Sequence, residues 1–115
     1  MQYLLMIYAE EGSWNKLPQA VQMEALGAYT AYGDALRKAG VLLGSNRLRD
    51  VSDATTVTVS NGKSQVMDGP FADTKEQLGG YYLIDVKNLD EAISWAARCP
   101  GASHGKVEVR PVWSM

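Results

Sequence analysis

The residues best suited to chemistry gather in one stretch, DGPFADTKE, which runs from Asp68 to Glu76. Asp-Gly-Pro is a turn sequence, because Asp accepts backbone hydrogen bonds, Gly permits positive φ and Pro fixes the next dihedral angle. Such a turn can also aim the Asp68 carboxylate and the Phe71 ring into a cleft, the first as base or hydrogen-bond acceptor and the second as an apolar wall. The two interpretations are compatible.

The second half of this stretch supports two interpretations as well. Asp73-Thr74-Lys75-Glu76 has the composition of a capped helical turn, with acids near the positive end of the helix. If the segment lines a pocket instead, Lys75 can hold a substrate carboxylate while Asp73 or Glu76 handles a proton, because partial burial raises the pKa of a carboxyl group. The sequence does not rank these acids.

Other notable side chains stand in apolar segments. Arg110 lies within VEVRPVW, where a charged group needs a partner, either an internal carboxylate or a substrate anion. Tyr8 and the other tyrosines are expected mostly in the core or at an interface, with one or two facing a cleft. We interpret the three tryptophans as packing residues and Cys99 as a buried apolar side chain.

Composition and net charge limit the classes of partner and cofactor that the chain can bind. Eleven basic and thirteen acidic residues give a net charge of −2 without a basic cluster, which argues against nucleic acid and anionic lipid. No run of about 18 apolar residues predicts a membrane span. One cysteine and one histidine cannot close a zinc site, and the phosphate-loop, dinucleotide and hydrolase motifs are absent, so we expect no metal or cofactor. The single cysteine and the absence of a signal peptide favour the cytoplasm.

A single domain must position these residues, because 115 residues form one core of ordinary size. Periodicity predicts strands at 2–9, 41–43, 81–86 and 107–113, a helix from Pro18 to Lys38 or Ala39, and a second helix capped by Asn88 and ended by Pro100. The remaining segments, 46–52 and 68–80, are expected to be connections. Between them, Asn61-Gly62 joins two β-type segments and predicts a type I′ hairpin.

Two glycines interrupt the first predicted helix. Gly27 and Gly33 each cost up to about 1 kcal/mol relative to alanine in a helix interior. Either another backbone or a ligand approaches closely there, or tertiary packing tolerates them.

The order of elements is strand, helix, strand, inserted hairpin, strand, helix, strand. This order matches the ferredoxin-like βαββαβ plan, an α+β fold in which both helices cover one face of an antiparallel sheet. The opposite face would expose a large apolar patch, which packing against the sheet of a second subunit would cover. We therefore predict a homodimer.

Residues 68–86, DGPFADTKEQLGGYYLIDV, closely resemble the signature of the DGPF branch of YCII-related proteins. The resemblance extends over nearly the whole chain and includes residues 39–42, 54–57, 91–93, 95–98 and 107–111. It implies a ferredoxin-like fold paired into a dimeric α/β barrel, with a cleft between sheet and helices in each subunit.

The resemblance also carries functional expectations. Some YCII relatives are enzymes on small ring compounds, such as dehalogenating lyases related to muconolactone isomerases, and DGPF members are often encoded beside, or fused to, extracytoplasmic-function sigma factors. An acid after the first strand and a histidine on the first helix are the proposed catalytic pair. The acid position matches Glu10, the helix position falls on Tyr29, and no histidine precedes His104.

Two functions therefore remain open. A cofactor-independent lyase or isomerase would need a pocket of a few hundred Å³ in which Asp68, Glu76 or Glu10 meets a tyrosine. A small-ligand-binding or regulatory module, with a sigma factor as a possible partner, would need an exposed apolar groove without converging acids.

Overall fold

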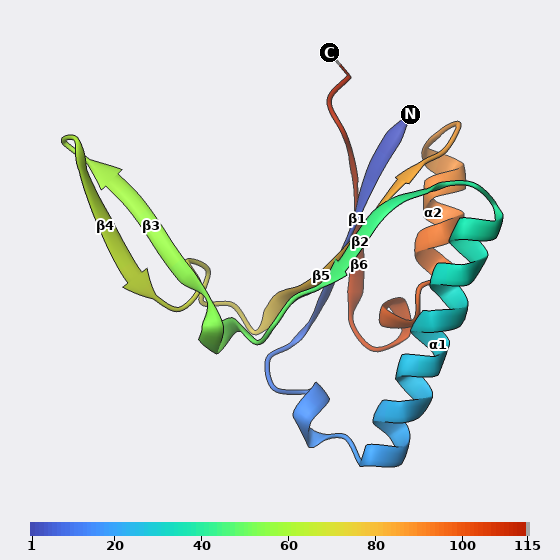
Figure 1. Cartoon of the computed structure of the whole chain (residues 1–115), viewed down its shortest axis with the longest axis horizontal. Helices are drawn as coiled ribbons and strands as arrows, with labels where there is room; N and C mark the ends of the chain where they lie inside the picture. Colours follow the sequence, from blue (N-terminus) through green and yellow to red (C-terminus); the bar gives the residue numbers. More distant parts are fainter. Residues whose placement is uncertain (115) are drawn as a thin grey trace.

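The computed structural model describes residues 1–114 and shows an antiparallel four-stranded sheet, two helices and a separate two-stranded hairpin (Figure 1). The strands are β1 (Gln2–Glu10), β2 (Leu42–Arg47), β3 (Thr55–Ser60), β4 (Lys63–Asp68), β5 (Glu76–Asp85) and β6 (Lys106–Pro111). The helices are α1 (Gln19–Lys38) and α2 (Leu89–Arg98), and three short 3₁₀ turns are η1 (Trp14–Lys16), η2 (Val51–Asp53) and η3 (Pro100–Ser103).

The strand order confirms the predicted ferredoxin-like fold. In the main sheet the order is β2-β5-β1-β6, and every neighbouring pair is antiparallel. Both helices lie on one side of this sheet, and the β3–β4 hairpin projects from the other side (Figure 1). The inserted hairpin therefore leaves the βαββαβ core undisturbed.

Alternation along β1 decides which face of the sheet carries the core. Tyr3, Leu5 and Ile7 are buried and pack with Leu36 of α1 and Ala92 of α2. Successive side chains of a strand point to opposite faces, so the residues between them lie on the side without helices. We call this side the helix-free face; from the strand register its members are Leu4, Met6, Tyr8, Tyr81, Leu83, Glu108 and Arg110.

The predicted helix boundaries are set by local hydrogen bonds. The Asn88 side chain accepts a hydrogen bond from the backbone N–H of Glu91 at 3.0 Å, and the Glu91 carboxylate accepts one from the N–H of Lys87 at 3.2 Å. The first contact satisfies a donor that the first turn of α2 would otherwise leave unpaired, and the second ties that turn to the residue before the cap. Pro18 directly precedes α1, so the predicted start of that helix is confirmed as well.

The hairpin follows the prediction from Asn61-Gly62. Both turn residues adopt positive φ, 51° and 77°, as a type I′ turn requires. We call residues 55–68 the arm. At its base the Gly69 N–H donates to the Ala54 carbonyl at 2.7 Å, and the Thr56 hydroxyl donates to the Gly69 carbonyl at 2.8 Å.

Two strands are longer than predicted, and both extensions depend on glycine. β2 continues to Arg47, and β5 begins at Glu76, inside the segments expected to be connections. Gly80 pairs with Arg47 in this extension, and a Cβ at Gly80 would lie 3.0 Å from the Asn46 carbonyl oxygen. Gly-Gly therefore permits a close strand contact here, whereas the sequence pattern suggested a loop.

The capped helical turn predicted for Asp73–Glu76 is wrong. The Gln77 side chain donates to the carbonyls of Ala72 and Thr74, both at 2.8 Å, and the Thr74 hydroxyl donates to the Glu76 carbonyl at 2.7 Å. These side-chain hydrogen bonds hold the segment as a loop that leads directly into β5.

The internal salt bridge predicted for Arg110 is also wrong. Of the ion pairs formed within residues 1–114, none includes Arg110. β6 is an edge strand, so Arg110 lies exposed on the helix-free face and needs no internal carboxylate.

The two helical glycines have no close backbone neighbour. No atom lies within 4 Å of the position that a Cβ would occupy at Gly27, and at Gly33 only the Arg37 side chain does. Of the two explanations left open by the sequence, tolerance by packing fits the structure.

We expect the substitution Gly27→Ala to raise the free energy of unfolding by about 0.5–1 kcal/mol, because alanine loses less backbone entropy in a helix. Urea denaturation of both proteins measures the difference. Gly105→Ala is the matched contrast, since its Cβ would lie 2.1 Å from the Tyr8 carbonyl oxygen and should destabilise the fold. A loss of stability in Gly27→Ala would contradict the explanation by packing.

Candidate functional site

A cavity of about 640 Å³ opens at the end of the sheet where β1 and β2 finish. Its walls come from the end of β1, the η1 turn, the middle of α1, the β2–η2 segment and the start of β5. Its polar and aromatic lining residues include Glu10, Trp14, Tyr29, Arg47 and Tyr82. Its volume falls in the range of about 300–1,000 Å³ that small-molecule sites occupy.

Arg47 supplies the positive charge of this cavity. Its guanidinium lies over the Trp14 ring, 4.6 Å from the ring centroid, a contact that orients the cation without neutralising it. None of the ion pairs within residues 1–114 includes Arg47, whereas neighbouring Arg49 pairs with Asp53 at 3.1 Å. Arg47 is therefore the cation of the cavity that can bind an anionic group of a ligand.

Tyrosines form the apolar wall and contribute hydroxyl donors. Burial raises the pKa of Tyr29 to about 12, with smaller contributions from Cys99 and Tyr82, and Arg47 acts in the opposite direction. Burial likewise raises the pKa of Tyr82. Both phenols are thus neutral at physiological pH, and neutral phenols donate hydrogen bonds rather than accept protons.

Close packing fixes the hydroxyl of Tyr29. A Cβ at Gly101 would lie only 2.8 Å from that hydroxyl oxygen and 2.7 Å from the Cγ2 atom of Ile7. Glycine in the η3 turn therefore allows α1, β1 and the segment after α2 to meet beside the cavity.

A second cavity of about 360 Å³ lies on the other side of Glu10. Lys75, Glu76, His104 and Lys106 are among its lining residues, and Glu76 forms an ion pair with Lys106. Glu10 belongs to the linings of both cavities. Glu10 therefore lies where the two cavities adjoin.

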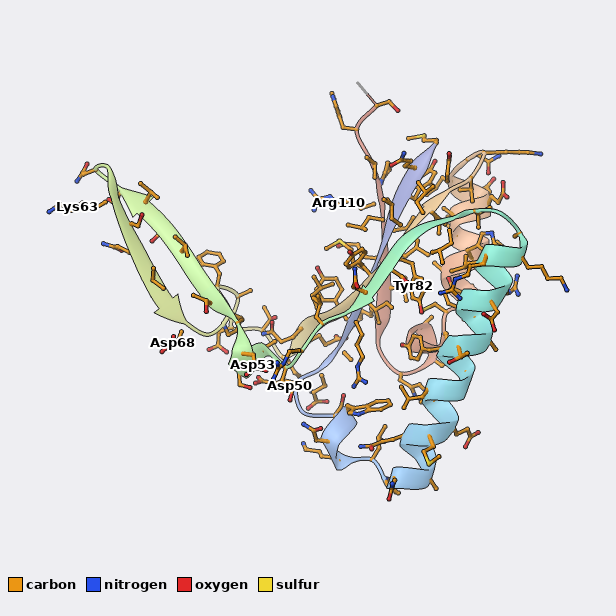
Figure 2. The ribbon with its side chains drawn as sticks, in the orientation of Figure 1. Asp50, Asp53, Lys63, Asp68, Tyr82 and Arg110 are labelled. Atoms are coloured by element: carbon orange, nitrogen blue, oxygen red, sulfur yellow. The ribbon has the colours of Figure 1, made fainter. Side chains whose placement is uncertain are left out.

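The structure brings together only some of the residues predicted from the sequence. Glu10 and Tyr29 line the main cavity, and Glu76 and Lys75 line the smaller one. The others line neither cavity; they are Asp68, Phe71, Asp73, Tyr8 and Arg110. Figure 2 shows Asp68 on the arm and Arg110 on the sheet, while Tyr82 lies toward the helices. The roles assigned to all of these residues stay predictions.

Sequence reasoning misses two residues of the main cavity, Trp14, which its type marks as a packing residue, and Arg47, which lies in a predicted polar connection. No local signal marks these two residues, because they meet through contacts between distant segments. Tyr82 is one of the tyrosines of which one or two are expected to face a cleft, and it lines this cavity. Trp113, also interpreted as a packing residue, is 84% exposed.

Within residues 1–114, no three His, Cys, Asp or Glu side chains come close enough to share a metal ion. No helix of that region combines the length and apolar character that a membrane crossing requires.

The fold and the cavity define the class of protein: a ferredoxin-like domain with a cavity between the end of the sheet and α1. The match to the YCII-related domain family covers residues 1–115, and the chain belongs to this family. An uncharacterised protein of Rhizobium meliloti (strain 1021) is 40% identical over 117 residues, which cover 97% of this chain and 92% of the relative.

A solved structure with the same fold supports this class. The 5-chloro-2-hydroxyhydroquinone dehydrochlorinase of Burkholderia phenoliruptrix AC1100, in complex with 2,5-dihydroxybenzoquinone, superposes with a TM-score of 0.57. The alignment covers 99% of this chain and 94% of the dehydrochlorinase at 17% sequence identity. At this identity the similarity establishes the fold alone.

The raised pKa of Tyr29 predicts a stability loss at alkaline pH. Between pH 10, where an unfolded tyrosine ionises, and about pH 12, the unfolded state releases a proton that folded Tyr29 keeps. The free energy of unfolding therefore falls as pH rises through this interval. In Tyr29→Phe the fall should be shallower, as urea denaturation at a series of pH values would show. An unchanged slope would mean that Tyr29 titrates normally.

Proposed function

We propose that the protein is an acid–base enzyme of the lyase or isomerase type, acting on a small cyclic compound with an anionic oxygen bound in the main cavity. The observation that carries this proposal is that Glu10 and Tyr29, from two different elements, line one cavity together with Arg47. A carboxylate, a neutral hydroxyl and a cation are the groups that proton abstraction beside a carbonyl requires.

Each residue has one task in the proposed reaction. Glu10 accepts a proton from a saturated ring carbon beside a ring carbonyl; the electron pair of the broken C–H bond forms a C=C bond while the π pair of the carbonyl moves onto its oxygen. The Tyr29 hydroxyl and the Arg47 guanidinium then stabilise the negative charge on that oxygen, in the manner of an oxyanion site. Return of the proton from Glu10 to another ring carbon completes an isomerisation. Trp14 offers its ring to the Arg47 cation and an apolar surface to the substrate.

The comparison with solved structures supports a ring compound as the ligand. The dehydrochlorinase of the same fold is named for a chlorinated hydroxyhydroquinone, and its complex holds 2,5-dihydroxybenzoquinone. Such compounds are small, planar and anionic when their hydroxyl groups ionise. They fit a cavity of about 640 Å³ that contains aromatic walls and one unpaired arginine.

The enzyme proposal predicts separate effects on turnover and binding. With a panel of hydroxylated and halogenated ring compounds in D₂O, the protein should incorporate deuterium into a ring C–H position. Glu10→Gln should slow this exchange by roughly 10²–10⁴-fold, the usual contribution of a general base, while ligand affinity changes little. Arg47→Gln should weaken the binding of 2,5-dihydroxybenzoquinone by about tenfold or more, because charge-assisted hydrogen bonds contribute about 1.5–3 kcal/mol.

The matched controls are Glu24→Gln on the exposed face of α1 and Arg37→Gln, which removes a cation that is paired with Asp34 and does not line the cavity. Binding that depends on Arg47 without any exchange would instead identify a ligand-binding module. Association of that ligand-bound form with an extracytoplasmic-function sigma factor would make the module regulatory. The absence of both binding and exchange for every compound of the panel would exclude the proposal.

The proposed enzyme is a homodimer formed through the helix-free face. Leu4, Met6, Tyr8, Tyr81 and Leu83 lie half-buried on this face with no helix over them. Contiguous apolar side chains on a sheet surface are usually covered by another protein surface. Packing against a second copy would form the dimeric α/β barrel that the fold class contains.

We expect light scattering to give the mass of a dimer for dilute wild-type protein. Leu83→Lys, which places a charge at the centre of the helix-free face, should shift the protein toward monomer. Lys87→Glu, an exposed charge change outside this face, is the control. Because Leu83 lies on the side of the sheet away from the core, circular dichroism should show a folded monomer. A wild-type monomer would refute the homodimer.

A further inference from the structure

The arm has almost no support within its own chain. Its strands form a sheet of only two strands, and every residue from Val57 to Asp68 is exposed. The exposed fractions of its large apolar side chains are high: Val57 59%, Val59 67%, Val66 66% and Met67 59%. A lone two-stranded hairpin is marginally stable in water, so a contact with another surface is the expected reason for a well-formed arm.

The two faces of the arm differ in polarity. Val57 lies directly opposite Val66 in the register, and Val59 is two residues further along the same face. We call this the valine face. The opposite face is the more polar of the two: it carries Thr58 paired with Gln65 and Ser60 paired with Lys63, and its one large apolar side chain is Met67, paired with Thr56. Alternation of this kind marks a strand pair with one face packed on a partner and one face in water.

The main sheet presents a second uncovered apolar surface, the helix-free face. In Figure 1 the arm projects from the side of the sheet that bears this face, away from both helices. The proposed homodimer brings a second copy to that same side. In a two-fold dimer each copy presents its valine face and its helix-free face to the other copy. Both apolar surfaces of each copy can therefore be covered by the partner.

Charge supports the same partner. Asp68 pairs with Thr55 at the base of the arm and lies on the valine face, and Arg110 lies on the helix-free face opposite Leu4. Neither side chain takes part in an ion pair within residues 1–114. Asp68 on the arm and Arg110 on the helix-free face are therefore complementary between copies, with Glu108 two residues before Arg110 on the same face.

We propose that the arm clasps a second copy of this chain, with its valine face packed on the partner and Asp68 paired with Arg110 of the opposite copy. This inference rests on the homodimer named under the proposed function, and it adds a contact that the sheet faces do not supply. Hydrophobic burial gives the clasp its stability, and the charge pair fixes its orientation.

The decisive test is a set of variants compared by sedimentation across a dilution series. Val57→Asp and Val66→Asp should each weaken the dimer by at least about tenfold, since a buried carboxylate without a partner opposes association. Thr58→Asp and Gln65→Asp introduce the same charge on the same two strands but on the opposite face, and they should change the dissociation constant less than about twofold. Equal effects of the two sets would overturn the proposal.

Charge reversal tests the orientation. Asp68→Arg and Arg110→Asp should each weaken the dimer, and the double variant should recover most of the lost affinity. Failure of the double variant to recover would refute the ion pair. Because the arm lies outside the core, circular dichroism of the variants should match the wild type.

Hydrogen exchange provides a readout that does not depend on substitution. Backbone amides of Thr56–Val59 should exchange more slowly as wild-type concentration rises through the dimer dissociation constant, because the clasp protects the arm only in the dimer. Exchange rates that are independent of concentration would contradict the clasp. If Leu83→Lys produces monomers while the valine variants remain dimeric, the arm proposal fails and the homodimer stands. A monomeric wild-type protein would refute both the arm proposal and the homodimer.

Discussion

The structure depends on one side chain, Tyr32, which joins three elements at a single point. Its hydroxyl donates a hydrogen bond of 2.7 Å to the Trp95 carbonyl of α2, and its ring meets the Tyr82 ring of β5 edge-on, with centroids 5.1 Å apart. The side chain is 5% exposed. Because Tyr32 belongs to α1, this contact sets the position of α1 over the sheet. Tyr29, one turn earlier on the same helix, is thereby placed on the cavity wall, as residues three apart share a helix face.

Much of the fold could be predicted from the sequence because the signals were local. Asn61-Gly62 encodes its own turn, Asn88 caps its own helix, and the continuous apolar run at 2–9 marks a strand inside the sheet. Predictions failed where a residue's conformation depends on a distant segment. Gly80 extends β5 because the carbonyl of Asn46 lies close to it, and nothing within residues 76–80 reveals that neighbour.

The candidate site was less predictable for the same physical reason. The Asp68-Gly69-Pro70 motif is conspicuous in the sequence because turns have strong local requirements, and the structure uses it to close the base of the arm. Arg47 carries no comparable signal. Its significance comes from Trp14, 33 positions earlier, and from its lack of an ion-pair partner within the described residues 1–114, properties that exist only in three dimensions.

Burial separates the donor and acceptor groups of the cavity. Tyr29 and Tyr82 are backed by the core, and burial raises their pKa values, so their hydroxyls keep the protons that they use for hydrogen bonding. Glu10 stands at the exposed end of β1, where water can carry away a proton that it has accepted. A base in the core would be costly to ionise, and a phenol at the surface would compete with water for the substrate oxygen. The arrangement therefore suits proton transfer at the boundary between the apolar wall and solvent, where a bound ring would present its carbon to Glu10 and its oxygen to Tyr29 and Arg47.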